Sequence, residues 1–419
     1  MLSDIKALLR PVKKRWLDYC RLKKARRKLG RWREYKVKHD KVRIGFIMQN
    51  PSIWNKQQAL FERIASDTDF EVIGLLVPDF EGSDLDVNEG KRYVYGNEHT
   101  YFHGIYKNVV DVIADNKVID IKGLNLDYVF YQRPYDILLL DELRVKNVID
   151  FARTLYIAYA YTGSLSIEEL QLGCKDFYTY LYCYFTESSH VKELFENDKY
   201  YCVLYKKGLL HYRYLGYPMF DELLKKTRTF RDDSKRIRIL WTPRWTYDEK
   251  VGGSHFFEYY KELIEFHKEN QNVQLIIRPH PLMFDNFIAQ GLITEKWKKD
   301  FFAELKALDI VFDTNSDVND TFSEIDVLIT DYSSIIVNYC FFGKPMIYCP
   351  SDCNVLNTSM AEIMKSGYIA TNWGEIKNAL DEIIMGSDKL KNVRLTIKEK
   401  LYKEHVDAIG KIINQIKSF

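Results

Sequence analysis

Short apolar runs alternate along this chain with longer stretches in which apolar residues recur at helical spacing. Residues 42–48 form one such run, residues 57–65 have the helical spacing, and residues 70–77 form a second run. The pattern returns in the second half, with strand-like runs at 237–241, 273–277, 327–329 and 346–349. Strands that alternate with helices predict parallel sheets of the α/β class. Because 419 residues exceed one ordinary core, we expect two such domains.

One polar turn in the second half carries candidate chemistry. The run Val327–Ile329 leads into a turn that contains Asp331, Ser333 and Ser334, and an apolar, helix-like segment follows as far as Phe342. Serine hydroxyls and free backbone N–H groups at a helix start, with the positive end of the helix dipole, suit an anion. The turn therefore predicts a binding site for a phosphate or pyrophosphate.

Cationic side chains follow two other strands of the same half. Arg278 and His280 come directly after the run 273–277, each followed by a proline that restricts the backbone. Arg244 follows the run 237–241 and comes directly after Pro243. Ligands of an open α/β sheet bind outside the carboxyl ends of its strands, so these cations and the serine turn are expected to meet on one phosphorylated ligand.

Four segments together resemble the CDP-glycerol glycerophosphotransferase family, the teichoic-acid primases and polymerases. They are Gly216-Tyr217-Pro218 with Asp221, the segment 240–245 (LWTPRW), the segment 278–281 (RPHP), and residues 326–334 (DVLITDYSS) followed by 343–348 (GKPMIY). The resemblance implies a GT-B-like fold, in which two Rossmann-like, doubly wound domains face a cleft. We expect a basic arm at 1–40, an acceptor domain at 41–205, a nucleotide-donor domain at 206–395, and a C-terminal helix at 396–419 that crosses back to the first domain.

The resemblance also implies a reaction. A CDP-activated polyol phosphate such as CDP-glycerol would place its pyrophosphate between the RPHP segment and the serine turn, and an acceptor hydroxyl would expel CMP. The residues expected to bind the donor phosphates are Arg278, Ser333, Ser334, Arg244 and Asp331, with weaker donor contacts from Ser254, His255 and Asp352. His280 is the expected catalytic residue of this domain. No acidic DxD pair stands near these groups, so we expect no cofactor and no essential metal.

The first domain offers fewer candidates. Asp136 follows the strand-like run 128–131 and is our candidate base or acceptor-orienting group, although it could equally cap the next helix. The family's His-Gly motif is missing, because residues 159–163 read Tyr-Ala-Tyr-Thr-Gly. His99 and His103 lie in a Tyr- and Gly-rich stretch, where surface or packing roles outweigh a catalytic one.

The first 40 residues are strongly basic. They hold fifteen Lys and Arg against four acidic residues, a net charge of +11, whereas the whole chain carries +2 and the remainder therefore −9. Trp16 and Leu17 are among the apolar residues at helical spacing in this arm. A basic amphipathic helix with tryptophan suits an anionic membrane surface, and packing on the domain or in an oligomer is the alternative. Nucleic acid is not expected as a partner, because the acidic body would repel it.

No secretory signal or membrane-spanning run stands out, and the seven cysteines form no CxxC pair. We therefore expect a peripheral protein on the cytoplasmic face of the membrane, with a lipid-linked or polymeric acceptor. Two other functions stay open. A GT-B glycosyltransferase would use a nucleotide sugar at the same pyrophosphate site, and a non-catalytic partner of a polymer-assembly complex would bind no nucleotide.

Overall fold

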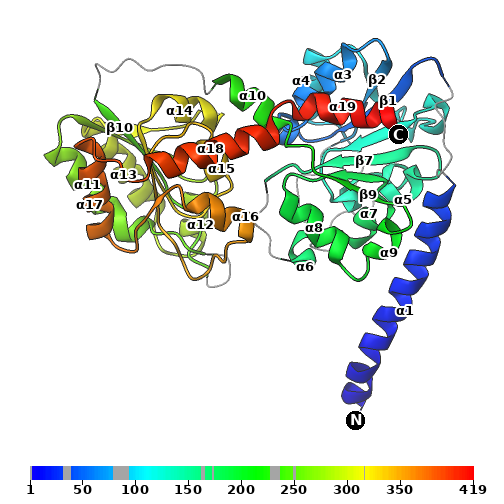
Figure 1. Cartoon of the computed structure of the whole chain (residues 1–419), viewed down its shortest axis with the longest axis horizontal. Coiled ribbons are helices and arrows are strands. Elements are labelled where there is room, and N and C mark those ends of the chain that lie inside the picture. The colour runs from blue at the N-terminus through cyan, green and yellow to red at the C-terminus, as the bar shows by residue number, and fades with distance from the viewer. Residues whose placement is uncertain are drawn as a thin grey trace. The chain divides into compact units, whose positions relative to one another are not determined.

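The computed structural model describes residues 2–31, 39–78, 94–161, 166–171, 174–226, 236–248, 252–315 and 317–419. The chain divides into two compact units (Figure 1). The first comprises Met1–Met219 together with Asp407–Phe419, and the second comprises Phe220–Val406. Each unit is built around one parallel β-sheet, which confirms the expected α/β class.

The first unit contains a seven-stranded sheet of order β3-β2-β1-β6-β7-β8-β9. Its strands, all paired in parallel, are β1 (Val42–Met48), β2 (Phe70–Leu76), β3 (Val109–Asp111), β6 (Tyr128–Tyr131), β7 (Arg153–Ile157), β8 (Cys183–Phe185) and β9 (His211–Arg213). A small antiparallel hairpin of β4 (Ile113–Ala114) and β5 (Lys117–Val118) follows β3. The order of the strands reverses between β1 and β6, as in doubly wound folds.

Helices cover both faces of this sheet (Figure 1). They are α2 (Pro51–Trp54), α3 (Gln58–Ala65), α4 (Asn97–Ile105), α5 (Val145–Val148), α6 (Ile167–Gln171), α7 (Lys175–Tyr180), α8 (Ser189–Asn197), α9 (Cys202–Tyr205) and α19 (Ala408–Ser418), with short 3-10 turns at Lys122–Leu124, Asp136–Leu138 and Asp141–Leu143. The core is aromatic: Phe46 stacks on Phe130 and meets Trp54 and Phe61 edge-on. Trp54 is fully buried and packs within this core.

The second unit contains a six-stranded parallel sheet of order β12-β11-β10-β13-β14-β15. The strands are β10 (Ile237–Thr242), β11 (Val273–Ile277), β12 (Val311–Phe312), β13 (Val327–Thr330), β14 (Met346–Tyr348) and β15 (Tyr368–Ile369). In chain order this is the 3-2-1-4-5-6 arrangement of the Rossmann fold, whose ligand crevice lies between the first and fourth strands. Here these strands are β10 and β13.

The helices of the second unit also form two layers. They are α10 (Met219–Lys226), α11 (Phe256–Glu269), α12 (Met283–Ala289), α13 (Glu295–Ala307), α14 (Val318–Glu324), α15 (Ile335–Cys340), α16 (Thr358–Met364), α17 (Trp373–Ile384) and α18 (Lys391–His405). A continuous apolar cluster joins β10, β11 and β13 to α11, α12, α13 and α17, and fully buried Trp241 stacks on Phe256 at its centre. Burying each such side chain contributes about 1.5–3 kcal/mol.

The same device sets the strand register in both units. In the first, Asp127 accepts a hydrogen bond from the backbone N–H of Arg43 through its carboxylate and donates its own N–H to the Arg43 carbonyl, both at 2.8 Å. In the second, Asp326 makes the same pair of bonds with Arg238 at 2.7 and 2.8 Å. Each aspartate thereby fixes the fourth strand of its sheet against the first.

Two expectations about chain organisation need correction. The first unit continues beyond residue 205, because β9 completes its sheet and the division falls at Met219. The C-terminal region is not one helix, because α18 ends at His405 and α19 begins at Ala408. Val406 leaves the helical conformation with ψ 133°, and Asp407 after it has the left-handed φ of 55°. The segment that follows this break belongs to the first unit.

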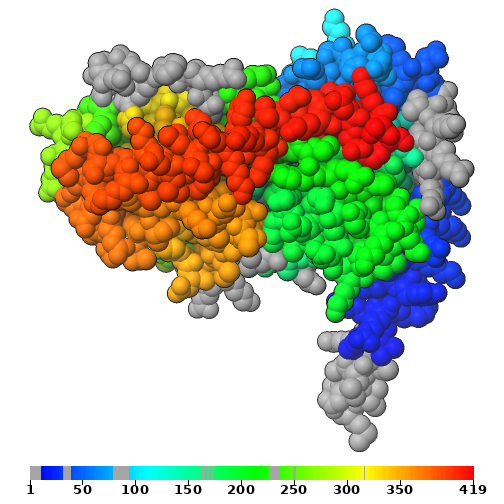
Figure 2. Space-filling model, viewed as in Figure 1, coloured from blue at the N-terminus to red at the C-terminus, as the bar shows by residue number. Residues whose placement is uncertain are grey.

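The basic arm forms α1 (Leu2–Gly30), and residues 32–38 lie outside the described chain. Its C-terminal part packs on the first unit: Ala25 and Leu29 are buried, and Lys28 forms an ion pair of 2.6 Å with Asp150. The described turns before them, blue in Figure 2, also contact this unit, because Asp18 pairs with Lys175 of α7 at 2.8 Å. Trp16 there is 63% exposed. None of the described helices is long and apolar enough to cross a membrane.

Candidate active site

Two threonines lie at the carboxyl ends of β10 and β13, where the ligand crevice of this fold is expected. Thr242 ends β10 and Thr330 ends β13, and the Thr242 hydroxyl donates to the Thr330 hydroxyl at 2.7 Å. Both are buried. The loops that leave these strands start from a fixed position, so the side chains they carry are held at the carboxyl edge of the sheet.

Asp331 organises the loops around this crevice. Its buried carboxylate accepts from the backbone N–H of Arg244 at 2.7 Å and from that of His255 at 3.1 Å. The other carboxylate oxygen lies 2.7 Å from Nδ1 of the His255 ring. An anion used in this way holds the neighbouring groups in place and would repel a phosphate, so Asp331 acts in positioning.

His255 and Asp331 form an oriented imidazole–carboxylate pair. A carboxylate can only accept, so Nδ1 carries the hydrogen and Nε2 is the nitrogen that titrates. Burial by itself lowers the pKa of His255, but the hydrogen bond with Asp331 and its negative charge outweigh that effect and raise the pKa above 6.5. The ring also stacks on Tyr259 at 5.5 Å. The sequence had placed His255 only among the weaker donor contacts.

Arg244 lies beside this pair. Its Nη1 donates to the carbonyl of Tyr332 at 2.9 Å, and its guanidinium lies 5.5 Å from the centre of the Tyr332 ring. Burial lowers its pKa, although an arginine stays charged at neutral pH. A half-buried guanidinium at a sheet edge is suited to phosphate oxygens.

Arg278 is held by a partner that the sequence did not indicate. Its Nη1 donates to Asp313 at 2.8 Å, and Asp313 follows β12 and is buried. Asp313 also accepts from the Thr321 hydroxyl at 2.7 Å and from the Asn315 N–H at 3.0 Å. Although burial opposes it, these bonds and the charge of Arg278 lower the pKa of Asp313. The guanidinium is thus fixed in orientation at the end of β11.

His280 reaches the surface two residues further on. Its Nδ1 accepts the backbone N–H of Leu282 at 3.2 Å, so the ring hydrogen of the neutral form is on Nε2. Partial burial, followed by the charge of Arg244, lowers the pKa of His280 below 6.5. In the free protein at neutral pH it is therefore a neutral N–H donor. Binding of a pyrophosphate would favour its protonated form.

The serine turn begins α15, but the helix is short. Ser333 Oγ accepts from the Ile335 N–H at 3.4 Å, whereas Ser334 is exposed and makes no capping hydrogen bond through its side chain. Because α15 has only six residues, its dipole is weaker than the sequence implied. The exposed Ser334 hydroxyl and the N–H groups of this first turn remain the candidate phosphate contacts.

The remaining weaker candidates differ in exposure. Ser254 is buried and its hydroxyl accepts from the N–H of Phe256 at the start of α11, so it acts within the fold. Asp352 is exposed in the loop after β14. That loop contacts the one before α11, because the Asn354 side chain donates to the Gly252 carbonyl at 3.1 Å. Gly253 there has φ +94°, and a side chain at this position would meet Asn354.

Three further motif residues have structural roles. Lys344 donates its ammonium group to the carbonyls of Phe322, Ser323 and Ile325 at 3.0, 2.7 and 2.7 Å, and so caps the C-terminus of α14. Tyr217 is buried and donates to the Ala158 carbonyl at 3.0 Å, after Gly216 with φ +95°. Asn338, in the helix that follows the serine turn, is buried and donates to Asn319 at 3.0 Å.

A glutamine network defines the corresponding edge of the first unit. Gln132, after β6, accepts from the N–H groups of Gln49 and Asn50 and donates to the Asn50 carbonyl at 2.7 Å. Gln49, after β1, accepts from Arg133 Nη2 at 2.9 Å. Both glutamines are buried. These bonds place Arg133 at the switch point of the first sheet, a role that the sequence did not single out.

Asp136 lies in the next turn and is half-buried. Burial raises its pKa to about 6, against the opposing effect of a 3.1 Å hydrogen bond from the N–H of Val145 at the start of α5. It therefore caps α5, the alternative role, while its raised pKa also suits a general base.

Tyr159, from the altered His-Gly segment, forms a hydrogen bond of 2.9 Å with the Tyr135 hydroxyl. Residues 162–165 lie outside the described chain.

The fold and this site define a two-unit α/β protein in which cationic side chains and a serine turn lie at one sheet edge of the second unit. The family of CDP-glycerol:poly(glycerophosphate) glycerophosphotransferases matches residues 176–404, more than half of the chain, and the chain belongs to this family. The resemblance drawn from the four sequence segments is thereby confirmed, and the protein is a transferase of the glycerophosphotransferase type. No curated protein matches the chain.

Solved structures support the fold. A UDP-N-acetylglucosamine 2-epimerase, described as putative, from Listeria monocytogenes aligns with 90% of this chain and 96% of its own at 14% identity and a TM-score of 0.56. HepE from Anabaena, in complex with UDP-glucose, aligns with 90% of this chain and 100% of its own at 11% identity and a TM-score of 0.52. The wall teichoic acid polymerase TagF aligns with 99% and 96% at 15% identity, but its TM-score of 0.48 is too low to support an inference. At these identities the likeness establishes the GT-B-like fold and not the substrate.

Proposed function

We propose that this protein transfers a polyol phosphate, glycerol phosphate or a similar group, from a CDP-activated donor to a hydroxyl of a lipid-linked or polymeric acceptor. The product would belong to a cell-surface polymer of the teichoic acid or capsule type. One observation carries the proposal: Arg278, Arg244, His280 and the serine turn all lie at the carboxyl ends of neighbouring strands in the unit that the family match covers. A nucleotide-activated donor also agrees with the UDP-glucose bound by the structural neighbour HepE.

In the proposed reaction the donor's pyrophosphate lies between the RPHP segment and the serine turn. The acceptor oxygen attacks the phosphorus that bears the polyol, and the bond from that phosphorus to the bridging oxygen breaks. CMP leaves with the electron pair, and the acceptor proton passes to a base. Phosphoryl-type transfer requires mainly alignment and positive charge around the equatorial and leaving oxygens.

The chain's own residues supply these requirements. Arg278, whose guanidinium donates to Asp313, and Arg244, whose guanidinium donates to the Tyr332 carbonyl, provide two oriented cations. His280 provides an Nε2–H donor that gains a full charge if it is protonated against the phosphates. Asp136 in the first unit is the proposed base or acceptor-orienting group, because its pKa of about 6 allows it to accept a proton near neutral pH.

The N-terminal arm is the proposed membrane contact. On α1, Trp16, Leu17 and Tyr19 are 63%, 44% and 63% exposed, although Asp18 among them pairs with Lys175 of α7 at 2.8 Å. Exposed Lys13, Lys14 and Arg15 precede them directly. A surface that combines exposed aromatic and basic side chains suits an anionic lipid headgroup layer. We therefore place the enzyme on the cytoplasmic face of the membrane as a peripheral protein, where a lipid-linked acceptor would be within reach.

Calorimetric titration of the purified protein with CDP-glycerol, CDP-ribitol and UDP-glucose tests the donor assignment. We expect binding of a CDP-polyol, and in Arg278→Ala an affinity about 10- to 100-fold lower, because a charge-assisted bond to phosphate contributes about 1.5–3 kcal/mol. Lys299→Ala, on exposed α13, is the matched control and should bind as the wild type does. Binding of UDP-glucose alone would favour a nucleotide-sugar glycosyltransferase, and binding of no nucleotide would favour a non-catalytic role.

A further inference from the structure

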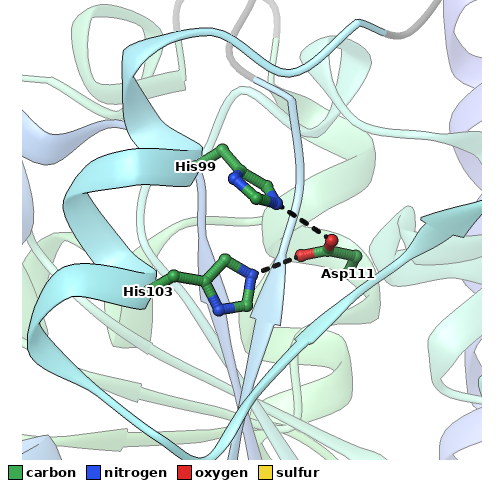
Figure 3. Close-up of side chains that lie close together, drawn as sticks. All are labelled: His99, His103 and Asp111. Carbon is green, nitrogen blue, oxygen red and sulfur yellow. Dashed lines mark hydrogen bonds and ion pairs between the residues drawn. The ribbon is translucent and has the colours of Figure 1, made fainter.

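Two histidines and one aspartate of the first unit lie close together beside its edge strand β3 (Figure 3). His99 and His103 are four residues apart on α4 and project from the same side of that helix toward Asp111. Asp111 is the last residue of β3. His99 Nε2 lies 3.1 Å from one Asp111 oxygen, and His103 Nε2 lies 2.7 Å from the other. The spacing of the histidines is visible in the sequence, but their partner is not.

We propose that these three side chains form a binding site for a divalent transition-metal ion, with Zn²⁺ as the best fit. All three ligand atoms lie within 4.8 Å of one another. In a tetrahedral zinc site with bonds of about 2.0–2.1 Å, neighbouring ligand atoms are about 3.3 Å apart. The two separations between Nε2 and a carboxylate oxygen, 3.1 and 2.7 Å, are close to that value. Two imidazoles and one carboxylate also match the donor set of three-ligand zinc sites.

The backbone that carries these ligands is held before any metal binds. Phe102, between the histidines, is fully buried and packs edge-on against Trp54 at 5.4 Å. Tyr95 packs beside His99 at 5.2 Å. Its hydroxyl donates to the Leu76 carbonyl at 2.9 Å and accepts from the Ile113 N–H at 3.1 Å. The start of α4 is thereby tied to β2 and to the chain just after β3.

The site is open to solvent, which suits reversible loading. The His99, His103 and Asp111 side chains are 43%, 36% and 33% exposed. A water molecule can therefore complete the fourth position. For metal to bind, each Nε2 must be free of hydrogen, so a neutral ring shifts its hydrogen to Nδ1 and a protonated ring releases one proton. A bound ion would join α4 to the edge strand β3 and act as a structural clamp there.

Metal titration of the full-length, untagged and reduced protein after chelator treatment tests the proposal. Co²⁺ should bind once per chain with the visible absorption of a tetrahedral site, and Zn²⁺ should displace it. His103→Gln and Asp111→Asn should lose the absorption band and bind Zn²⁺ at least about tenfold more weakly. His39→Gln removes an exposed histidine elsewhere and is the matched control, which should behave as the wild type.

Thermal unfolding gives a second readout. Zn²⁺ should raise the Tm of the wild type and of His39→Gln but not that of the two site variants, whose metal-free melting curves should match the wild type. Absence of stoichiometric Co²⁺ binding by the wild type overturns the proposal, whatever the variants do. Equal Zn²⁺ affinity in wild type, His103→Gln and Asp111→Asn overturns it as well, because the ion would then bind elsewhere.

Discussion

At the scale of single residues, the carboxyl edge of the second sheet depends on carboxylates as well as on cations. Asp331 holds the backbone of Arg244 and the ring of His255, and Asp313 holds the guanidinium of Arg278. Preorganised charges of this kind need no reorganisation when negative charge develops in a transition state. The residues that orient the site are therefore expected to matter as much as the residues that contact the donor.

Asp331→Asn should destabilise the protein. An amide cannot accept from both backbone N–H groups and from the imidazole, so at least one buried donor loses its partner, at a cost of about 1–3 kcal/mol. Urea unfolding measures this loss of unfolding free energy. Asp326→Asn, at the opposite end of the same strand, is the control for mutating a carboxylate that accepts a backbone bond. Only the Asp331 variant should also weaken donor binding, and unchanged binding there would contradict its positioning role.

His255 should make stability depend on pH. Its pKa is raised in the folded protein, so the folded state binds a proton more tightly than the unfolded chain with its ordinary value of 6.5. The stabilisation that the protonated His255 gives the folded state is fully present below pH 6.5. It is lost as the pH rises through the pKa of His255 in the folded protein. The destabilisation by His255→Gln, measured by urea unfolding, should therefore be larger at pH 6 than at pH 8. A difference from wild type that is equal at both pH values would show that the ring does not titrate as inferred.

At the scale of elements, the strands were the most predictable part of the fold. The apolar runs Val42–Met48, Tyr128–Tyr131 and Val273–Ile277 coincide with β1, β6 and β11. A fully buried parallel strand appears in the sequence as a continuous apolar run, because both of its faces must be apolar. The break between α18 and α19 was less predictable, because Asp407 itself adopts the left-handed conformation and the nearest glycine, Gly410, lies inside α19.

The hydrogen-bond partners of the site residues could not be predicted from the sequence, because they lie far away along the chain. Asp313 lies 35 positions from Arg278, and Asp331 lies 87 from Arg244. Such pairs are set by which strands become neighbours, and no local pattern encodes that. The types of residue at the strand ends were visible in the sequence, whereas their division between ligand contact and positioning required the fold.

Lys344 tests how one motif residue supports an element. Its ammonium group satisfies three carbonyls at the end of α14, so Lys344→Met should lower the unfolding free energy by about 2–3 kcal/mol. Lys365→Met, on an exposed turn, controls for the loss of charge and should change stability by less than about 0.5 kcal/mol. Equal, small effects in chemical denaturation would mean that the capping bonds contribute little. Donor affinity at temperatures below the unfolding transition should be retained in both variants.

At the scale of the whole molecule, two similar sheets carry different tasks. The second unit has Arg244, Arg278 and His280 near its switch point, whereas the first has one arginine, Arg133, together with glutamines, tyrosines and Asp136. The family match covers all of the site residues in the second unit but begins at residue 176. The arm, the altered His-Gly segment and the histidine pair on α4 all lie before the matched region.

The arm should control membrane binding. Replacing Lys13, Lys14 and Arg15 by Gln should weaken binding to phosphatidylserine vesicles about 100-fold in a sedimentation assay, because each basic residue near the surface contributes about 1 kcal/mol. The matched control replaces three exposed lysines of α13, Lys296, Lys299 and Lys306. Binding should also weaken as salt concentration rises. Equal binding by both triple variants would assign the arm to packing or oligomerisation instead.

The most direct test of the central claim is CMP release from CDP-glycerol and CDP-ribitol, measured beside UDP release from a panel of UDP-sugars, with purified protein and membranes. The wild type should release CMP from one of the CDP-polyols. His280→Ala should be slower by about 10²–10⁴-fold, because it loses a positioned proton donor at the phosphates. His39→Ala should match the wild type. Release of UDP from a sugar donor, with no CMP from either CDP-polyol, would contradict the proposed function.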